Sequence, residues 1–254
     1  MMDKKMRSVG RRILPLLIFF IAMVTGWGLL VALWDIPSWL VPAPHDVINR
    51  LLRARTLPLH IQLTTTEAFA GFALSVGVGV ALAVAICNSK FLESALLPYI
   101  TLLSSIPTVA IAPLLTIWLG FGMKPKIVTS MMISLAPIVM NTHKGLKSAD
   151  YRIYELMRSI DATPWQTAKM IDFPSALPFI FAAFKISVPL SIVGAVVSEF
   201  YGADHGLGYL VIVSAMQLET DMLFVAIGIL AFMGVASFII LSAIEKRFFS
   251  WGGR

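Results

Sequence analysis

The chain has 254 residues, of which 58% are hydrophobic and only 13% are charged. Soluble domains carry about 25% charged residues, so this composition excludes an ordinary soluble protein and indicates a membrane protein of one or two domains. The net charge of +6 does not indicate nucleic-acid binding, because Lys and Arg are scattered at the ends of apolar runs. The single cysteine, Cys87, excludes an internal disulfide, and no Cys/His spacing indicates a metal site.

The N-terminal residues are basic and precede an apolar run from Ile13 to Trp34, which is long enough to span the hydrocarbon core of a bilayer. This run is longer than the apolar region of a secretory signal, and no small-residue cleavage site follows it. We therefore interpret it as the first transmembrane helix. Residues 35–62 are more polar and contain a short helical pattern from Val47 to Leu52, which predicts an external amphipathic helix. Residues 1–62 thus form one part of the chain, and residues 63–254 form its core.

Five further apolar runs predict five more transmembrane helices, at about residues 67–87, 95–119, 127–141, 177–200 and 222–244. Gly71, Gly77 and Gly79 lie in the first of these runs. Small residues allow helices to approach closely in lipid, so we expect these three glycines to pack against a neighbouring helix. The sequence therefore predicts an all-α integral membrane protein with six spans.

The run at 95–119 contains three prolines, Pro98, Pro107 and Pro113, and polar Ser104 and Ser105. A proline leaves a backbone carbonyl that must be satisfied by a neighbour, a hydroxyl group or water. This pattern predicts one kinked helix. The kink either serves packing alone or places Ser104, Ser105 and Pro107 along a translocation path.

The distribution of positive charge predicts the orientation in the membrane. With these spans, 14 Lys and Arg lie on one side of the membrane and five lie on the other. The turn that holds Lys124 and Lys126 is on the side with five. Positive residues accumulate on the cytoplasmic side, so both termini and residues 142–175 are predicted to be cytoplasmic.

Residues 142–175 form the longest polar stretch between spans and carry Glu155, Arg158, Asp161, Lys169 and Asp172. So much polar sequence requires an aqueous environment. We interpret this loop as a docking site for another protein, in which an apolar anchor is surrounded by charged residues. Its anchor would be Trp165, and Ala162 and Thr163 are small enough for close approach. The alternative is an ordinary amphipathic loop on the lipid surface.

This stretch resembles the EAA loop of ABC-transporter permeases. Glu155, Ile171 and Pro174 fall at matching positions, and Asp161 stands where the family has Gly. The resemblance implies that the coupling helix, which transmits motion from the ATPase, lies around Ala162, Thr163, Trp165 and Gln166. It also implies that Glu155 orients the loop, through an ion pair or by capping a helix.

The resemblance extends from about residue 37 to the end of the chain. Ser105-Ile-Pro-Thr-Val-Ala-Ile-Ala-Pro-Leu-Leu115 and Glu199-Phe with Gly206-Leu-Gly208 are similar to the nitrate/sulfonate/taurine branch of these permeases. The segments Thr64–Phe72 and Ser191–Phe200 resemble members of the family that move thiamine-pyrimidine precursors, riboflavin or other aromatic solutes. The implied cargo is a small organic solute of these kinds, an aromatic acid or a sulfonate.

The resemblance implies a type I ABC importer permease fold in the inner membrane of a prokaryote. The implied partners are two ABC ATPase subunits, an extracytoplasmic solute-binding protein, a second permease copy as a homodimer, and membrane lipid, but no nucleic acid. The sequence has no G-x-x-x-x-G-K-[ST] phosphate cradle, so ATP hydrolysis is expected on a separate polypeptide. We expect no catalytic residue, cofactor or metal in this chain.

Charged and polar residues inside predicted spans are further candidates, because they are costly in lipid. Glu199 ends the fifth span and would line the outer gate or meet the binding protein, or else lie at the interface as a solvated or paired carboxylate. Ser191, in the same span, is a further candidate for the translocation path or gate. Glu67 is expected at the interface, and Lys185 is expected to extend to the inner surface.

Two other classes of function stay open on the sequence alone. One is a secondary transporter driven by an ion gradient, which would need paired intramembrane acids or broken helices in repeated halves. The other is a membrane scaffold that carries no solute.

Overall fold

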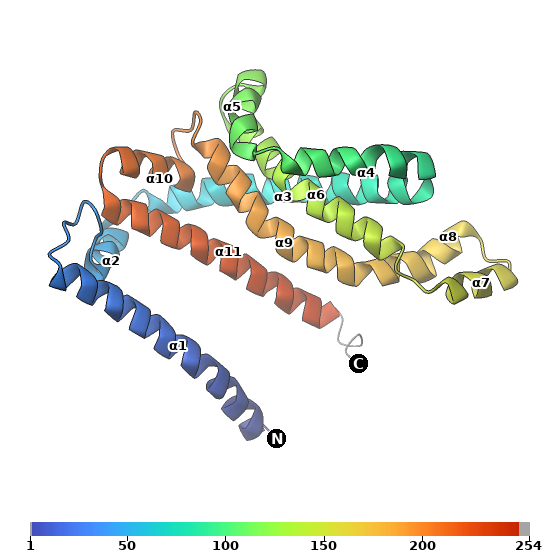
Figure 1. Ribbon diagram of the computed structural model, residues 1–254, viewed down its shortest axis with the longest axis horizontal. Coiled ribbons are helices and arrows are strands. Elements are labelled where there is room, and N and C mark those ends of the chain that lie inside the picture. The colour runs from blue at the N-terminus through green and yellow to red at the C-terminus, as the bar shows by residue number, and fades with distance from the viewer. Residues whose placement is uncertain (1, 249–254) are drawn as a thin grey trace. The chain divides into compact units, whose positions relative to one another are not determined.

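The computed structural model describes residues 2–248, and no strand occurs in that range (Figure 1). This confirms the predicted all-α fold class. The helices in chain order are α1 (Met2–Leu33), α2 (Pro44–Arg53), α3 (Leu57–Asn88), α4 (Lys90–Ser105), α5 (Thr108–Leu119), α6 (Met123–Leu146), α7 (Tyr151–Ser159), α8 (Pro164–Thr167), the π-helix η1 (Ala168–Asp172), α9 (Phe173–Glu199), α10 (Leu207–Met216) and α11 (Thr220–Phe248).

Four continuous helical stretches within the described residues are long and apolar enough to cross a membrane. They are Leu57–Asn88, Met123–Leu146, Pro164–Glu199 and Thr220–Arg247. The pair α4 and α5 satisfies the same criterion only if it is counted as one bent span. The described apolar part of α1, Ile18–Leu33, is a shorter helix. Several membrane-spanning helices are therefore present, while the count of six stays a prediction.

The predicted single kinked helix at 95–119 is wrong, because α4 and α5 are separate helices at an angle of 98° (Figure 1). Ile106 has extended backbone, with φ −77° and ψ 125°, as the residue before a proline prefers. Pro98 and Pro113 lie within α4 and α5 and do not break them. Only the Ile106–Pro107 step ends one helix and begins the next.

The chain forms two compact units. The first comprises the described residues up to 57 and residues 210–228, so it holds α1, α2, the end of α10 and the start of α11. Within it, the rings of Trp27 and Phe224 stack with centroids 5.4 Å apart. The predicted external amphipathic helix is present as α2. The functional division into 1–62 and 63–254 stays a prediction.

The second unit comprises residues 58–209 and the described residues from 229. In it α6 packs along α9, and α3 packs against α6. Small residues make the helices approach closely at this point. A Cβ on Gly194 would lie 2.6 Å from Ser130 Cα, and one on Gly71 would lie 2.7 Å from the Ile127 carbonyl oxygen. The Ser130 hydroxyl donates to the Ser191 carbonyl at 2.8 Å. Close backbone approach with hydroxyl bridges is typical of helix association in lipid.

The predicted packing of the three glycines in α3 is confirmed for Gly71 and Gly79 but is wrong for Gly77. A Cβ on Gly79 would meet Ile138 at 2.8 Å, whereas a Cβ on Gly77 would meet no described residue of another helix within 4 Å. Residues 77 and 79 are two positions apart and point to different sides of a helix. One glycine can therefore face α6 while the other faces outward.

Candidate functional site

The loop between α6 and α9, here called the α6–α9 loop (residues 147–172), has well-defined helix starts. Asp150 caps α7, its side chain accepting from Arg152 N at 3.0 Å. Thr163 and Gln166 form a capping box at α8, and Pro164 occupies its first turn. These caps satisfy N–H groups that would otherwise lack partners. The loop therefore presents two short, defined helices.

The residues that resemble the EAA loop lie on this framework. Asp161 has a φ of +51°, in the left-handed region, and stands where the EAA loop that it resembles has Gly. Asp is one of the few other residues that adopt this conformation at modest cost, so the turn tolerates the substitution. Glu155 is exposed on α7, Ala162 precedes the cap of α8, and Pro174 lies in the first turn of α9.

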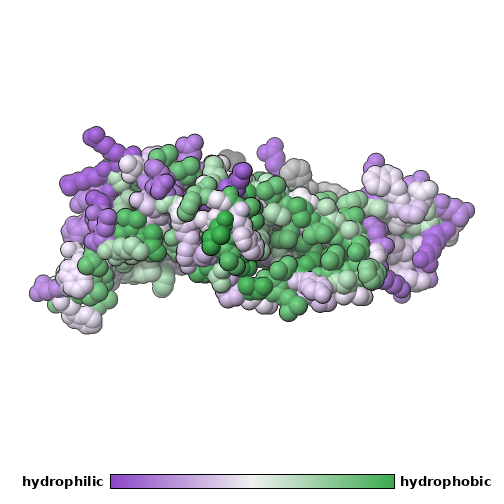
Figure 2. Space-filling model, turned by 90° about the horizontal axis from the view of Figure 1, so that it is seen from above, coloured by the Kyte–Doolittle hydropathy of each residue, from purple (hydrophilic) through white to green (hydrophobic). Residues whose placement is uncertain are grey.

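Trp165 is the most prominent apolar side chain of the loop, with 70% of its surface exposed. It borders a cavity of about 400 Å³, which is also lined by Cys87, Lys147, Tyr154 and Phe173. Over the second unit, Figure 2 shows a mostly hydrophobic face, with hydrophilic residues gathered at the end where α7 and α8 lie. An exposed tryptophan on a polar end is typical of an anchor for a protein partner.

Tyr154 connects α7 to the start of α9, because its hydroxyl donates to Asp172 Oδ1 at 2.6 Å. Burial, followed by the hydrogen bond and the charge of Asp172, raises the pKa of Tyr154 to about 12. The phenol is therefore protonated at neutral pH and holds the loop against the long helix.

The N-terminal ends of α3 and α6 meet in a buried ion pair. Lys126 Nζ lies 2.9 Å from Glu67 Oε1, and Glu67 has no exposed surface. The sequence pattern predicted Glu67 at the interface and Lys126 in a polar turn. The turn is shorter than expected, because α6 already begins at Met123. Lys126 is therefore on a helix, where it faces α3.

Glu199, at the end of α9, lies in the same region and is 1% exposed. Its Oε1 accepts from the Thr64 hydroxyl at 2.6 Å, and its Oε2 accepts from Gly208 N at 2.5 Å. Thr64 in turn accepts from Leu207 N at 2.8 Å. We call Glu67, Lys126, Thr64 and Glu199 the carboxyl cluster. It connects α3, the first turn of α6 and the end of α9 to the first turn of α10.

Gly206 lies against this cluster with a φ of +126°, and a Cβ there would overlap the Glu199 carboxyl group. Its backbone N–H lies 2.9 Å from His60 Nδ1. Sequence reasoning named Glu199 but assigned no role to Thr64, Lys126 or Gly206. The sequence signal for this cluster was a pair of glycines, Gly206 and Gly208, that follows an acidic residue at the end of an apolar run.

The five residues proposed for a translocation path fall into two groups. Ser104, Ser105 and Pro107 are exposed at the bend between α4 and α5, and the two serines donate to the Thr101 carbonyl at 2.7 and 3.1 Å. Ser104 borders a largely apolar cavity of about 370 Å³ formed with α6 and α9. Ser191 and Glu199 are instead buried between helices.

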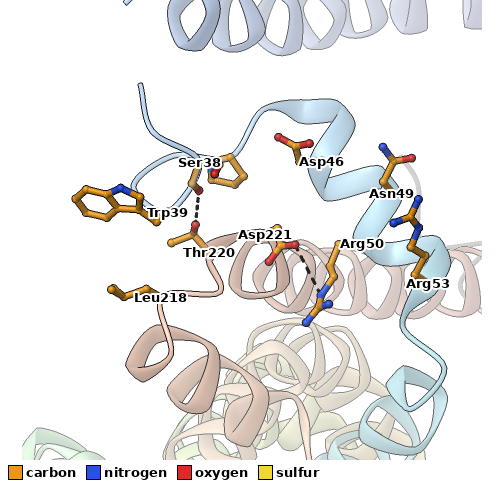
Figure 3. A pocket seen from close by; sticks show the side chains of 10 residues that line it. Ser38, Trp39, Asp46, Asn49, Arg50, Arg53, Leu218, Thr220 and Asp221 are labelled. Atoms are coloured by element: carbon orange, nitrogen blue, oxygen red, sulfur yellow. Dashed lines mark hydrogen bonds and ion pairs between the residues drawn. The ribbon is translucent and has the colours of Figure 1, made fainter. Parts of the chain in front are cut away.

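A polar cavity of about 440 Å³ lies within the first unit (Figure 3). Arg50 pairs with Glu219 and lies 3.8 Å from an Asp221 oxygen. The Thr220 hydroxyl donates to the Ser38 carbonyl at 2.6 Å. The remaining lining residues come from the turn before α2, from α2 and from the α10–α11 turn: Trp39, Pro42, Asp46, Asn49, Arg53 and Leu218.

Two other groups of charged residues in the second unit form ion pairs. Glu93 accepts from Lys147 at 2.6 Å and lies 3.3 Å from His143 Nε2. Lys185, which was expected to extend to the inner surface, lies 2.7 Å from Glu245 Oε2 on α11. Pairing lowers the cost of a charge in an apolar environment.

Comparison with known proteins identifies relatives over most of the chain. Residues 75–250 match the family described as "Binding-protein-dependent transport system inner membrane component". The chain is 30% identical to the riboflavin transport system permease protein RibX of Chloroflexus aurantiacus, covering 97% of this chain and 94% of that protein. It is 29% identical to the formylaminopyrimidine transport permease protein ThiX of Halalkalibacterium halodurans, over 92% and 94% of the two chains.

The fold also has a solved counterpart. A chain from an inward-facing structure of the MetNI methionine ABC transporter superposes with a TM-score of 0.61, covering 75% of this chain and 97% of that one. The two sequences are 18% identical, so this similarity concerns the fold alone.

Proposed function

Because the chain belongs to the family of binding-protein-dependent transport system inner membrane components, it is the permease subunit of an ABC importer, and we propose that its α6–α9 loop receives the ATPase. The permease is not itself an enzyme, since the ATPase of such importers is a separate subunit. The family places the chain in the inner membrane as a multi-pass protein.

The exposed Trp165 on a capped helix carries this proposal. The capping box of Thr163 and Gln166 holds α8, and Tyr154 holds α7 to Asp172, so the anchor is presented on defined helices. A pre-ordered anchor loses little conformational entropy on binding. Glu155 and Asp161 lie on the preceding helix and turn, where charges would surround the anchor.

If the α6–α9 loop binds the ATPase, then this loop and both termini are cytoplasmic. The positive-inside rule supports this, because the loop and the N-terminal residues are rich in Lys and Arg. The cavity of Figure 3 then belongs to the extracytoplasmic side, where the solute-binding protein docks. The cavity is lined by both cationic and anionic side chains, such as Arg53 and Asp46, and this lining suits contact with a polar protein surface.

The solute path is proposed to follow the cavity at the α4–α5 bend, and a second copy of the chain would complete it. Supporting this, the cavity is mostly apolar with Ser104 and Thr108 as polar groups. Such a lining suits a small organic solute with an aromatic or aliphatic body. A riboflavin-like or pyrimidine solute, as named for the relatives RibX and ThiX, is therefore proposed as the cargo class.

The ATPase assignment is tested by replacing the anchor. Trp165→Ala should weaken binding of the ATPase by about 2 kcal/mol or more, which is roughly thirtyfold, because hot-spot tryptophans carry this much binding energy. The measurement is recovery of the ATPase with the tagged permease from detergent-solubilised membranes. Trp118→Ala is the matched control, since Trp118 is equally exposed, at 71%, but lies on α5. Equal recovery with both variants would exclude Trp165 as the anchor.

The partners themselves are tested by isolating the unmodified chain from its native membrane and identifying the associated proteins by mass spectrometry. We expect an ABC-type ATPase, and an extracytoplasmic binding protein when its solute is present. A chain that is isolated alone would contradict the proposed docking.

A further inference from the structure

The carboxyl cluster contains two acids and one base, all removed from solvent. Glu67 is fully buried, Glu199 is 1% exposed, and Lys126 is the cation paired with Glu67. Thr64, whose hydroxyl donates to Glu199 Oε1 at 2.6 Å, lies three positions before Glu67 on α3, so the Glu67 side chain is on the face of α3 that meets Glu199. Two ionised carboxylates with one ammonium would leave an uncompensated negative charge inside a membrane protein, which is costly.

The hydrogen bonds of the cluster locate the atom that lacks a donor. Both oxygens of Glu199 accept, one from Thr64 and one from Gly208 N. Glu67 Oε1 accepts from Lys126, but Glu67 Oε2 is buried and has no donor. Two carboxylates cannot hydrogen-bond to each other, whereas a carboxylic acid and a carboxylate can.

The surrounding groups do not supply a second positive charge. His60 Nδ1 lies 2.9 Å from Gly206 N and 3.1 Å from the Gly206 carbonyl oxygen, and a ring whose Nδ1 accepts from the nearer N–H is neutral. The ring of His205 stacks on that of His60, with ring centroids 5.7 Å apart. The backbone of Gly206 packs against the Glu199 carboxyl group so closely that no Cβ would fit.

We propose that Glu67 and Glu199 form a proton-binding site that holds one proton between Glu67 Oε2 and the Glu199 carboxylate. The proton comes from water. The bound state contains one carboxylic acid, one carboxylate and the Lys126 ammonium, so the cluster has no net charge. The proton belongs to the pair as a unit, as in other close carboxyl pairs.

The consequence is a proton-dependent packing of α3 against α9. With the proton bound, the two acids attract each other through a hydrogen bond. Without it, two carboxylates face each other in a buried environment and repel. Alkaline conditions should therefore favour separation of these helix ends.

Infrared spectroscopy of the purified permease in detergent tests the bound proton directly. We expect the carbonyl band of a buried, protonated carboxylic acid in the unmodified protein at neutral pH. The band should be lost in Glu67→Gln and in Glu199→Gln, because either substitution leaves one carboxylate for one ammonium. Glu245→Gln is the control and should retain the band, since Glu245 pairs with Lys185 alone. Absence of the band from the unmodified protein, or its persistence in both variants, would overturn the proposal.

Thermal unfolding distinguishes the proton from simple structural damage. The amide introduced by Glu67→Gln would keep its oxygen toward Lys126 and direct its N–H to Glu199, so it imitates the protonated acid. We expect Glu67→Gln to retain the melting temperature at neutral pH and to lose the decrease in stability that the unmodified protein shows as pH rises. The same pH dependence in both proteins would refute the shared proton. Neither measurement involves the ATPase, so the outcome is independent of the proposed docking.

Discussion

At the scale of single residues, Gly206 shows how a backbone conformation serves a buried acid. Its φ of +126° is unfavourable for residues with a side chain, and the space for a Cβ is taken by the Glu199 carboxyl group. Both conditions apply because Gly206 directly precedes the first turn of α10, whose N–H groups at Leu207 and Gly208 donate to Thr64 and Glu199. The glycine is therefore required by geometry and by packing.

Gly206→Ala should accordingly lower the free energy of unfolding by about 1–3 kcal/mol from backbone strain alone, with further loss from the displaced carboxyl group. Gly77→Ala is the matched control, since Gly77 is helical and faces open space. That change should be neutral or stabilising by up to about 1 kcal/mol, because alanine favours helix more than glycine does. The melting temperatures of the two purified variants in detergent provide the comparison. Equal destabilisation would contradict the packing described around residue 206.

Tyr154 gives a prediction about pH at the same scale. Because its folded-state pKa is raised from 10.0 to about 12, its contribution to stability is fully present below pH 10 and is lost as pH rises toward 12. In a spectrophotometric titration, the difference between the unmodified protein and Tyr154→Phe should show one phenol ionising near pH 12. Asp172→Asn removes the charged acceptor and should move this transition part of the way toward pH 10, since burial remains. A transition near pH 10 in the unmodified protein would exclude the buried hydrogen bond.

At the scale of elements, the helices were predictable from composition and apolar run length, but their breaks were not. Three prolines in the run at 95–119 look equivalent in sequence, and only Pro107 separates two helices. The difference depends on whether the residue before the proline has room to become extended, which is decided by tertiary packing. Local sequence does not contain that information.

The same limit applies to the sites. The α6–α9 loop could be identified because its polarity stands out between apolar runs. The carboxyl cluster could not, because Glu67 and Lys126 are 59 positions apart and each looks like an ordinary residue near a helix end. Pairing across helices depends on how each helix is rotated about its own axis. A shift of either side chain by one position along its helix would separate the two charges.

The start of α8 can be tested by its cap. Thr163→Ala removes the hydroxyl that accepts from Gln166 N, and should destabilise this turn by about 0.5–2 kcal/mol. The permease should remain folded while ATPase recovery falls, because α8, the proposed coupling helix, would lose its defined start. Thr163→Ser retains the hydroxyl and should behave like the unmodified chain. If alanine and serine gave the same recovery, the cap would have no part in docking.

At the scale of the whole molecule, the polar contacts support one consistent topology. Arg50 with Glu219 and Glu67 with Lys126 each join segments that the predicted topology assigns to the outer side. Glu93 with Lys147 joins two segments assigned to the inner side. Each pair therefore agrees with the predicted order of loops.

The proposed solute path gives the last prediction. Ser104 borders the cavity at the α4–α5 bend, and its hydroxyl is used only within its own helix, so a larger side chain there fills the cavity without breaking a contact between helices. Ser104→Trp should therefore abolish most solute uptake in proteoliposomes containing the ATPase and binding protein, while complex recovery stays normal. Thr101→Trp is the control, because Thr101 is exposed on the same helix but does not line the cavity. If solute passed along that cavity between two copies of the chain, only the first variant would be blocked. Undiminished uptake by Ser104→Trp would place the route elsewhere. The apolar lining of this cavity would then no longer support the proposed class of cargo.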